Sequence, residues 1–513
     1  MNLTTDKWIP VVWEDGRADK VSLLAVFQQG DQIRDLSVRP HERIALMRLL
    51  ICIAQAALDG PKNQEEWKTC QARLPAAAAM YLAKWKHAFE MFGDGQRFLQ
   101  VNNVLVAKEL ADDELSSPSK LDFALATGNS TTLFDNAGGS QRIFCPDILA
   151  IQLLTHQNFS PGGLIGDVQW NGIAMGRTSN HSPCVVKAML HAYVVQGLLL
   201  KTVCANLISA EQVNILNCEW GAPIWEKMPD GPKAIENVKN ATQTYLGRLV
   251  PMSRVVKLSR DGRSMVMGAA FPYDPKWRET AATIVIRERN GNPERVILNA
   301  SLVKSVWREA HSMAVLSAAN SQMLGGPVAL MSRNKAESVD LWCGALVANK
   351  AKLLDAFESV LHIPASMFSD TGQRLYQQGV QQAESWGRRI NHAVSVCHRE
   401  LHDDLDKAEF RKRGNVVKQR ATSHYWTAIE QKVPLLLALI ENPEPLSPDG
   451  ASKENWGATD WGKALARTAR SAYELACPHE TPRQLKAYSL GLSVFFKPVE
   501  SEAPETSTEE IEE

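Results

Sequence analysis

The 513-residue sequence lacks the motifs on which much nucleotide, metal and hydrolytic chemistry depends. It has no GxxxxGK[ST] loop, no GxGxxG after a strand, and no HExxH or GxSxG. Its nine cysteines include no CxxC pair, which argues against a zinc ribbon and favours reduced thiols. No apolar run approaches the roughly 20 residues that a membrane span needs, and the N-terminus has no signal-peptide core. We therefore expect a cytoplasmic protein that carries no cofactor and no metal.

The charge balance gives only weak support for nucleic-acid binding. The chain has 56 Lys and Arg against 57 Asp and Glu. Residues 500–513 contain seven Glu and no Lys or Arg, so the rest of the chain has 56 basic residues against 50 acidic ones. Such a surplus allows local basic patches but falls short of a basic face. We expect residues 497–513 to form an acidic, disordered tail.

The first part of the chain has the pattern of a mixed domain with hairpins and long loops. Apolar runs on both sides of turn residues predict four β-hairpins, with turns at 14–16, 261–262, 290–293 and around 348–350. Residues 42–62 predict a buried helix, and a second helix follows from 64 towards 91 with an interruption at Pro75. Residues 121–180 are rich in Gly, Ser, Thr and Asn and lack periodicity, so we expect long loops there.

The pattern becomes helical after Pro364. Breaks near Gly414, at 441–450 and at 478–482 divide this part into about four helices, which is typical of an antiparallel bundle. We therefore predict an α+β protein in which a large mixed domain, residues 1–365, precedes a four-helix bundle, residues 366–496.

The closest approach to a catalytic group is Cys184 with His181 and His191. A cysteine and a histidine can form a thiolate–imidazolium pair, but this spacing along the chain does not establish contact. A buried thiol beside ordinary histidines is the simpler interpretation. His398 and His402 have helical spacing but no carboxylate partner, so they make a poor metal site.

Two other segments suggest binding to nucleic acid. Residues 160–176 are glycine-rich, and glycines let the backbone approach a ligand closely, although a simple surface loop explains them too. The stretch 411–420 has five basic residues, which can follow a phosphate backbone or form a solvated helix face. These residues are Arg411, Lys412, Arg413, Lys418 and Arg420.

Several segments, in this order, together resemble one family over nearly the whole chain. They are DKWIPV with a following DG, ERIALMRLLICIAQ, RFLQV, STTLFDN (130–136), SPCVVKAMLHAYVVQGLLLKTVCANL (182–207), VWREAH, VDLWCGALVANKAKLLDAFESV and TPRQLKAYSLGL (481–492). The pattern is similar to the large subunit (CasA family) of the type I-E CRISPR Cascade surveillance complex. The resemblance implies a non-enzymatic subunit that inspects duplex DNA for the protospacer-adjacent motif while the guide RNA tests the sequence.

The resemblance implies three motif-reading elements. The first is a glycine-rich loop, here Ser160–Gly166, with Gly162, Gly163 and Gly166 near the minor groove, where a Cβ would collide with the groove. The second is a basic residue of the hairpin at 254–268, either Arg260 or Arg263. The third is a wedge hairpin that starts to unwind the duplex, with Asn349 and Lys350 at its tip.

The wedge departs from the family pattern, because glutamine is expected where this chain has Lys350. A lysine can still separate a base pair sterically and bind a phosphate, but it lacks the amide's paired donor and acceptor. The stringency of motif reading is therefore open. The loop at 128–140, with Phe134 and Asn136, resembles the family's docking loop near the 5′ handle of the RNA, although Phe134 can instead be a core anchor.

The resemblance also implies the partners. They are a backbone loaded with guide RNA, an RNA-handle-binding subunit, small subunits that contact the bundle, double-stranded target DNA, and a helicase–nuclease recruited in trans. The basic cluster at 411–420 becomes a candidate track for a DNA strand or RNA. Two alternatives remain open at this stage: a Cys/His-dependent cytosolic enzyme and an assembly scaffold that does not contact the motif.

Overall fold

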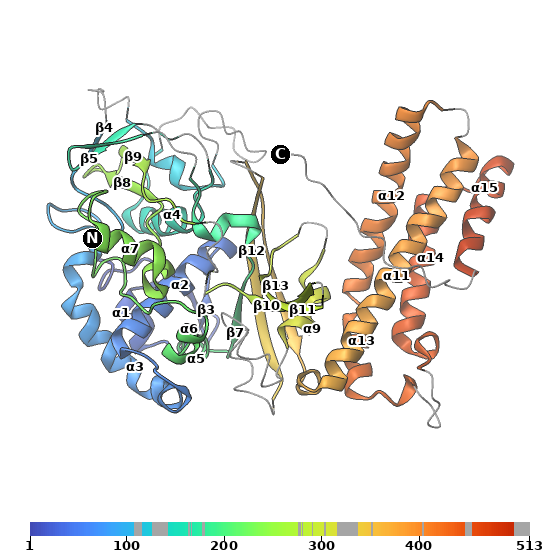
Figure 1. The fold of residues 1–513 in the computed structure, drawn as a ribbon, viewed down its shortest axis with the longest axis horizontal. Helices are drawn as coiled ribbons and strands as arrows, with labels where there is room; N and C mark the ends of the chain where they lie inside the picture. The colour runs from blue at the N-terminus through green and yellow to red at the C-terminus, as the bar shows by residue number, and fades with distance from the viewer. Residues whose placement is uncertain are drawn as a thin grey trace. The chain divides into compact units, whose positions relative to one another are not determined.

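The computed structural model of the chain is drawn in Figure 1. It describes residues 1–513 except 107–114, 126–141, 163–164, 166, 177–179, 275–278, 280, 290, 302–303, 315–336, 350–351, 403–404, 447–453 and 497–513. Its contacts divide the chain into two compact units, an N-terminal unit, Met1–Phe368, and a C-terminal unit, Ser369–Glu513.

The N-terminal unit combines helices with small antiparallel sheets. Its α-helices are α1 (Leu23–Gln28), α2 (Pro40–Leu58), α3 (Gln64–Lys84), α4 (Pro146–Phe159), α5 (Leu199–Ala205), α6 (Ala210–Ile215), α7 (Ile235–Gln243), α8 (Tyr245–Leu249) and α9 (Ala310–Met313). Its strands are β1 (Ile9–Trp13), β2 (Ala18–Val21), β3 (Ile33–Leu36), β4 (Val104–Val106), β5 (Val168–Trp170), β6 (Ile173–Met175), β7 (His191–Val195), β8 (Arg254–Leu258), β9 (Met265–Ala269), β10 (Ile284–Arg289), β11 (Asn292–Ile297), β12 (Val339–Asn349) and β13 (Lys352–Ile363). The sheets have the orders β2-β1-β3, β4-β5-β6, β8-β9, β10-β11 and β13-β12-β7. This composition confirms the mixed class of the fold.

All four predicted hairpins are present. They are β1–β2, β8–β9, β10–β11 and β12–β13, each antiparallel. The second strand of the first hairpin is short, because β2 ends at Val21 and the apolar run continues as a helix, Leu23–Gln28. The Ser22 side chain accepts the Ala25 N–H and so begins a helix in a run that reads as a strand.

The two predicted N-terminal helices are present with different limits. Helix α2 ends at Leu58, where Asp59 takes a left-handed conformation with φ 47°. It lies at the centre of the unit and contacts α3, α4, α5, α8 and β12, which explains its apolar sequence. The predicted interruption at Pro75 is wrong, since α3 continues through it to Lys84. Leu74 and Ala78, on either side of the proline, are fully buried, and this packing outweighs the missing hydrogen bond.

The expectation of long loops throughout 121–180 is also wrong, because this segment contains α4, β5 and β6. Every residue of α4 from Leu149 to Phe159 is buried. A helix that is buried on all sides shows no amphipathic period, so its sequence gives no helical signal.

The C-terminal unit is helical in all its regular elements within the described residues. The α-helices are α11 (Asp370–Leu401), α12 (Lys407–Glu430), α13 (Val433–Glu441), α14 (Asp460–Ala476) and α15 (Pro482–Leu492). Helix α11 contacts the other four, so the arrangement has one more helix than predicted. No break occurs at Gly414, because α12 runs through it and uses its lack of a side chain to approach His398.

Candidate nucleic-acid interface

The glycine-rich loop leaves the end of α4 at a fixed point. The last turn of α4 is buried, and Ser160 donates its backbone N–H to the His156 carbonyl at 2.8 Å. The Ser160 carbonyl accepts the Ser182 N–H at 2.9 Å. The described residues include Gly162, which is half-buried, but neither Gly163 nor Gly166.

A single arginine holds both ends of the segment that contains this loop. Arg254, the first residue of β8, donates from Nη2 to the carbonyls of Pro161 at 2.8 Å and Asn180 at 2.9 Å. Together with the Ser160–Ser182 hydrogen bond, these contacts close a neck, which we define as residues Ser160, Pro161, Asn180 and Ser182. The loop and the strands β5 and β6 lie between the two sides of the neck.

Gln157 of α4 fixes the arginine in turn. Its side-chain oxygen accepts the Arg254 N–H at 2.9 Å, and its amide nitrogen donates to the Arg254 carbonyl at 2.9 Å. The Ser253 hydroxyl donates to the Gln157 carbonyl, and the Ser182 hydroxyl donates to Ser253 at 2.7 Å. All these side chains are buried, so the neck rests on a hydrogen-bonded platform made by α4 and β8.

The predicted basic residues Arg260 and Arg263 lie in the turn between β8 and β9. Gly262 occupies this turn with φ +68°, a conformation that favours glycine. The side chains of Arg260 and Arg263 are 73% and 57% exposed and reach Asp94 and Asp261 respectively. Exposed ion pairs of this kind are weak, so both guanidinium groups can exchange their partners for a phosphate or a base edge.

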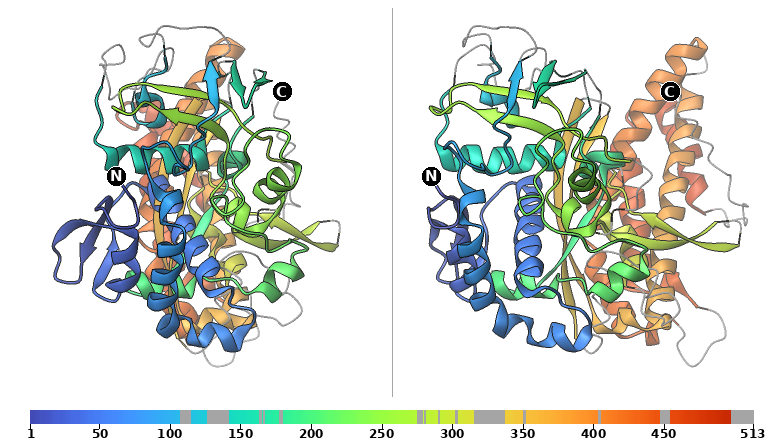
Figure 2. Two further views of the ribbon diagram at one scale, coloured as in Figure 1. Left: turned by 90° about the vertical axis from the view of Figure 1, so that its left-hand side faces the viewer. Right: turned by 60° about the vertical axis from the view of Figure 1, so that its left-hand side comes forward.

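The turn and the neck lie at opposite ends of the β8–β9 hairpin. Arg254 and Arg260 are six residues apart on an extended chain, which corresponds to about 20 Å. Helix α4 contacts both ends of the hairpin: Gln157 binds Arg254 near the C-terminal end of α4, and Leu149 lies against Gly262 near its N-terminal end. Figures 1 and 2 show the hairpin lying along α4.

Strand β5 provides a further contact between the loop segment and the hairpin. Val168, its first residue, lies directly over Gly268 of β9, where an added Cβ would come within 2.2 Å of Val168 Cγ2. Gly268 therefore permits a close approach of the two strands. Both sides of the glycine-rich loop, Pro161 and Val168, are thus held by the neck end of the same hairpin.

The predicted wedge is a long two-stranded hairpin. Strand β12 pairs with β13 from Val339↔Ile363 to Asn349↔Lys352, whereas its pairing with β7 covers only Asp340 to Gly344. The outer half of the hairpin is therefore two-stranded, with a bulge between Val347 and Ala348. The Asn349 backbone ends β12, while its side chain and all of Lys350 lie outside the described residues.

The predicted docking loop also lies outside the described residues, including Phe134 and Asn136. The segment that leads into it is held by Asp122. This carboxylate accepts from Arg39 Nη1 at 2.9 Å and from Gln152 Nε2 at 3.2 Å. Burial opposes its ionisation, but the hydrogen bond from Arg39 holds the pKa of Asp122 below its usual value.

The basic cluster lies on α12 but does not form one line of charge. Residues seven apart share a helix face, so Arg411 and Lys418 lie on one side of the buried stripe through Gly414 and Ala421. Arg413 and Arg420 lie on the other side. Arg413 is already paired with Glu409 at 2.7 Å. The side chains of Arg411, Lys412 and Arg420 are exposed, which leaves them available to a phosphate backbone.

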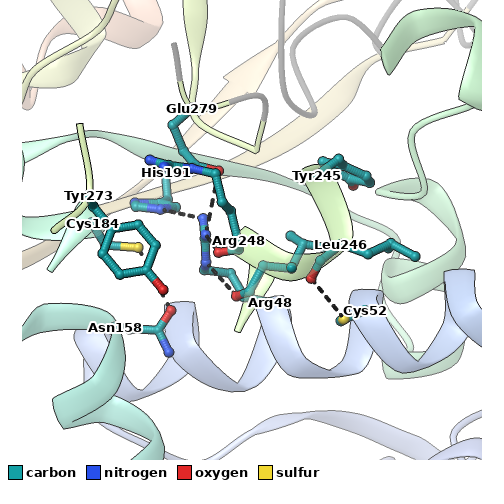
Figure 3. Close-up of polar contacts among 12 residues, drawn as sticks. Arg48, Cys52, Asn158, Cys184, His191, Tyr245, Leu246, Arg248, Tyr273 and Glu279 are labelled. Atoms are coloured by element: carbon teal, nitrogen blue, oxygen red, sulfur yellow. Dashed lines mark hydrogen bonds and ion pairs between the residues drawn. The ribbon is translucent and has the colours of Figure 1, made fainter. Parts of the chain in front are cut away.

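A separate group of charged residues lies in the core of the N-terminal unit (Figure 3). Glu279 is paired with Arg248 at 2.8 Å and with Arg48 at 3.6 Å, and all three are nearly inaccessible. Burial opposes ionisation of Glu279, but the two guanidinium groups outweigh it and keep the pKa of the carboxyl below its usual value. Arg48 also donates to the Leu249 and Arg248 carbonyls, so the network joins α2 to α8.

This core network does not favour the enzyme alternative. Cys184 is fully buried, and burial raises the pKa of its thiol to about 11. Its sulfur lies 3.7 Å from Asn158 Oδ1, while His191 Nε2 lies 3.3 Å from Arg48 Nη1. A nucleophilic cysteine needs a lowered pKa and access to substrate, and Cys184 has neither.

The described residues have neither a metal-ligand cluster nor a membrane-spanning helix. They contain no group of three or more His, Cys, Asp or Glu side chains placed to hold a metal ion. Within the same residues, no helix is both long enough and apolar enough to cross a bilayer.

The residue that sequence reasoning missed is Arg254. Its only signal is a charged residue at the start of the apolar strand RVVKL, and nothing in the sequence indicates that its partners lie 93 and 74 residues away. The structure thus brings the glycine-rich loop to Arg254, and it keeps Arg260 and Arg263 at the far end of the same hairpin.

Comparisons with known proteins agree on one family. The family model described as CRISPR-associated protein Cse1 matches residues 2–472. The CRISPR-associated protein CasA/Cse1 of Thermus thermophilus is 24% identical over 492 residues, which cover 89% of this chain and 92% of that protein. The crystal structure of CasA from the same organism has a TM-score of 0.72 at 21% identity and covers 97% of this chain and 98% of its own. A chain of a CRISPR RNA-guided surveillance complex has a TM-score of 0.68 at 16% identity, with 97% and 99% covered.

Proposed function

The chain belongs to the CasA/Cse1 family, the large subunits of type I-E CRISPR Cascade, and on this premise we propose that it reads the protospacer-adjacent motif in double-stranded DNA. The proposal includes a non-catalytic role: the subunit opens the duplex to start the R-loop and helps to recruit a helicase–nuclease, in the cytoplasm.

One observation carries the motif-reading proposal. Helix α4 supports both the glycine-rich loop, through Ser160, and the turn with Arg260 and Arg263, through Leu149. A rigid helix can therefore present a backbone surface and a pair of exposed cations to one duplex. The glycine loop suits the minor groove because it has no side chains to collide with the groove, and the arginines suit phosphates or the groove edge.

The long β12–β13 hairpin supports the proposal of a wedge. Its two-stranded outer half ends in the sequence Asn349-Lys350, the position at which the family resemblance predicts the wedge tip. A hairpin held at its base by β7 can deliver this tip to the first base pair beyond the motif. We propose that Lys350 separates that pair sterically and binds a phosphate of the opened strand.

The C-terminal unit has a different proposed role. It corresponds to the predicted bundle, and we propose that it contacts the small subunits and that the exposed cations of α12 follow a nucleic-acid backbone without reading bases. The loop with Phe134 and Asn136 is proposed to dock near the RNA handle.

The decisive test compares guide-loaded complexes assembled with and without this chain. Labelled duplexes that differ only in the motif are titrated at two salt concentrations, which separates phosphate attraction from selective readout. We expect this chain to confer motif-dependent binding that persists at the higher salt. Equal binding of all duplexes in both complexes would leave only the role of an assembly scaffold.

The wedge is tested separately by opening of the duplex. In the assembled complex, Lys350→Ala and Asn349→Ala should slow R-loop formation, measured by 2-aminopurine fluorescence beside the motif, while initial duplex binding changes little. Lys350→Gln restores the amide expected in the family and should alter motif stringency. A scaffold predicts that all three variants behave as wild type.

A further inference from the structure

Arg254 is an unusual buried charge. Its residue is 1% exposed, and within the described residues no carboxylate forms an ion pair with it. Its guanidinium donates only to main-chain carbonyls: Ser253 at 2.8 Å from Nη1, and Pro161 and Asn180 from Nη2. Buried charges normally have a paired partner, as Arg248 has in Glu279. The contribution of Arg254 therefore lies in the placement of its hydrogen bonds and not in an ion pair.

The geometry defines that contribution. Both hydrogens of one planar nitrogen point to two carbonyls, one from each side of the neck. Those carbonyls begin and end a segment of the chain that contains Gly162, β5 and β6. If the guanidinium is removed, two carbonyls lose their donor, and among the described residues the Ser160–Ser182 hydrogen bond is what still joins the two sides of the neck.

We propose that Arg254 is a positioning residue that closes the neck of the glycine-rich segment and so holds the two ends of this segment in place for motif reading before DNA arrives. The inference rests on the proposed function, because it assigns the loop a duplex to read. It adds a residue that contacts no DNA itself and acts through the backbone of Pro161 and Asn180.

The platform below Arg254 supports this assignment. Gln157 binds both the N–H and the carbonyl of Arg254, so the arginine backbone cannot shift without breaking contacts to α4. Burial lowers the pKa of Arg254 to about 10, which still leaves the guanidinium protonated near neutral pH. All the donors that close the neck are therefore present in the free protein.

A segment whose ends are fixed in advance has less conformational freedom to lose when it binds a ligand. Opening the neck should therefore weaken binding to the correct motif, where the loop must make specific contacts. It should have little effect on non-specific binding, which depends on phosphate attraction. We expect the ratio of correct-motif to wrong-motif affinity to fall on the order of tenfold.

The test uses the assembled complex with Arg254→Met, which keeps the apolar length of the side chain and removes every donor. Arg254→Lys is the second variant, because an ammonium group retains donors for a carbonyl of the neck. Gln55→Met is the matched control: Gln55 is also fully buried and donates to a main-chain carbonyl, that of Ile208 at 2.6 Å, but it does not contact the neck. Two quantities are measured: hydrogen exchange of peptides within 160–182, and the affinity ratio for duplexes with correct and wrong motifs.

The expected result is faster exchange within 160–182 and a lower ratio in Arg254→Met, partial recovery of both in Arg254→Lys, and wild-type values in Gln55→Met. If Arg254→Met does not assemble, the Lys variant decides alone, and wild-type values of both quantities in it overturn the proposal. Faster exchange with an unchanged ratio overturns it too, since the neck would then serve folding only. If the wild-type complex has no motif preference, the proposed reading function is wrong. The proposed role of Arg254 is then wrong too, whatever the hydrogen exchange shows.

Discussion

The two units of the molecule differ in which groups form hydrogen bonds with their buried polar atoms. The N-terminal unit contains buried arginines and glutamines that donate to main-chain carbonyls far away in sequence, and a buried glutamate, Glu279, that is paired with two of the arginines. In the described part of the C-terminal unit the buried polar side chains are His398 and Thr459, and the ion pairs lie at the surface. Helices satisfy their own backbone, whereas irregular segments need side chains to do so.

The difference has a consequence for function. In the proposed function the glycine-rich segment presents its backbone to DNA, which requires rigid supports, and Arg254 and Gln157 hold the ends of this segment. The C-terminal unit relies mainly on aromatic and aliphatic packing, and its buried rings also donate to main-chain carbonyls of a neighbouring helix. Trp461 donates to the Gly379 carbonyl at 3.0 Å, and Tyr425 donates to the Ala383 carbonyl at 2.8 Å. Its stability should therefore depend on shape and only slightly on charge.

The largest expected effect is loss of the buried charge network. Glu279→Gln keeps the shape but removes the carboxylate that Arg48 and Arg248 share, which should destabilise the N-terminal unit by about 3–5 kcal/mol. The matched change in the C-terminal unit, Glu409→Gln, removes an exposed partner of Arg413 and should cost less than about 1 kcal/mol. Denaturant unfolding followed by hydrogen exchange of peptides from each unit measures both. Equal losses would contradict the contrast between the units.

Acid should act mainly on the N-terminal unit. Burial holds the pKa of His41 at about 4 and that of His156 at about 3, whereas both titrate near 6.5 in the unfolded chain. Below pH 6.5 the unfolded chain therefore binds more protons, and stability is lost as the pH falls towards 4. Between pH 7.5 and 5.5 each histidine should remove about 1.4 kcal/mol. Unfolding at the two pH values tests this, and an equal loss in a His41→Gln, His156→Gln double variant would refute it.

A steric change should act on the C-terminal unit. An added Cβ at Gly379 would lie 2.3 Å from Leu436 Cδ1, so Gly379→Ala should destabilise the unit by about 1–3 kcal/mol. Gly387 lies on the same helix, where the nearest atom would be Trp426 Cζ2 at 3.2 Å. There the helix propensity gained with alanine, about 1 kcal/mol, should roughly offset the tighter contact. If thermal unfolding shows a larger loss of stability for Gly387→Ala than for Gly379→Ala, steric fit does not control the stability of this unit.

The smallest expected effect concerns the basic cluster. Arg420→Gln should reduce the slope of log affinity against log salt by about 0.7–0.9 per lost phosphate contact, equally for all motifs. Arg413→Gln is the control, because Glu409 already neutralises Arg413. The slopes come from titrations of the assembled complex at several salt concentrations. A motif-dependent effect of Arg420→Gln would mean that the C-terminal unit takes part in reading.

Elements with local signals were predictable, and those held by distant partners were not. The four hairpins follow from turn residues between apolar runs, and α2 follows from its continuous apolar sequence. Helix α4 was not predictable, because burial on all sides removes its period. The limits of α12 were misjudged because a glycine that permits close packing is indistinguishable from one that ends a helix.

The same distinction applies to the candidate site. The residues of the glycine-rich loop, the hairpin turn and the wedge could be named from the sequence and its family resemblance, and their roles remain proposals. Arg254 could not be named, since its role depends on two carbonyls from distant parts of the chain. The sequence shows the basic cluster as a run of basic residues. Which of these residues lie on which side of α12 depends on the face that the helix buries, and the sequence does not give this.

The closed neck has a consequence for how such a protein changes over generations. One nitrogen of Arg254 binds the carbonyls of both Pro161 and Asn180, so the chain between these two residues is a segment whose ends lie next to each other. Insertions or deletions in the part of this segment between the neck and β5 need not move α4 or β8, since loop length adds little entropy once the ends are joined. If the loop reads DNA as proposed, related proteins can change the motif that they read while the supporting helix and strand stay the same.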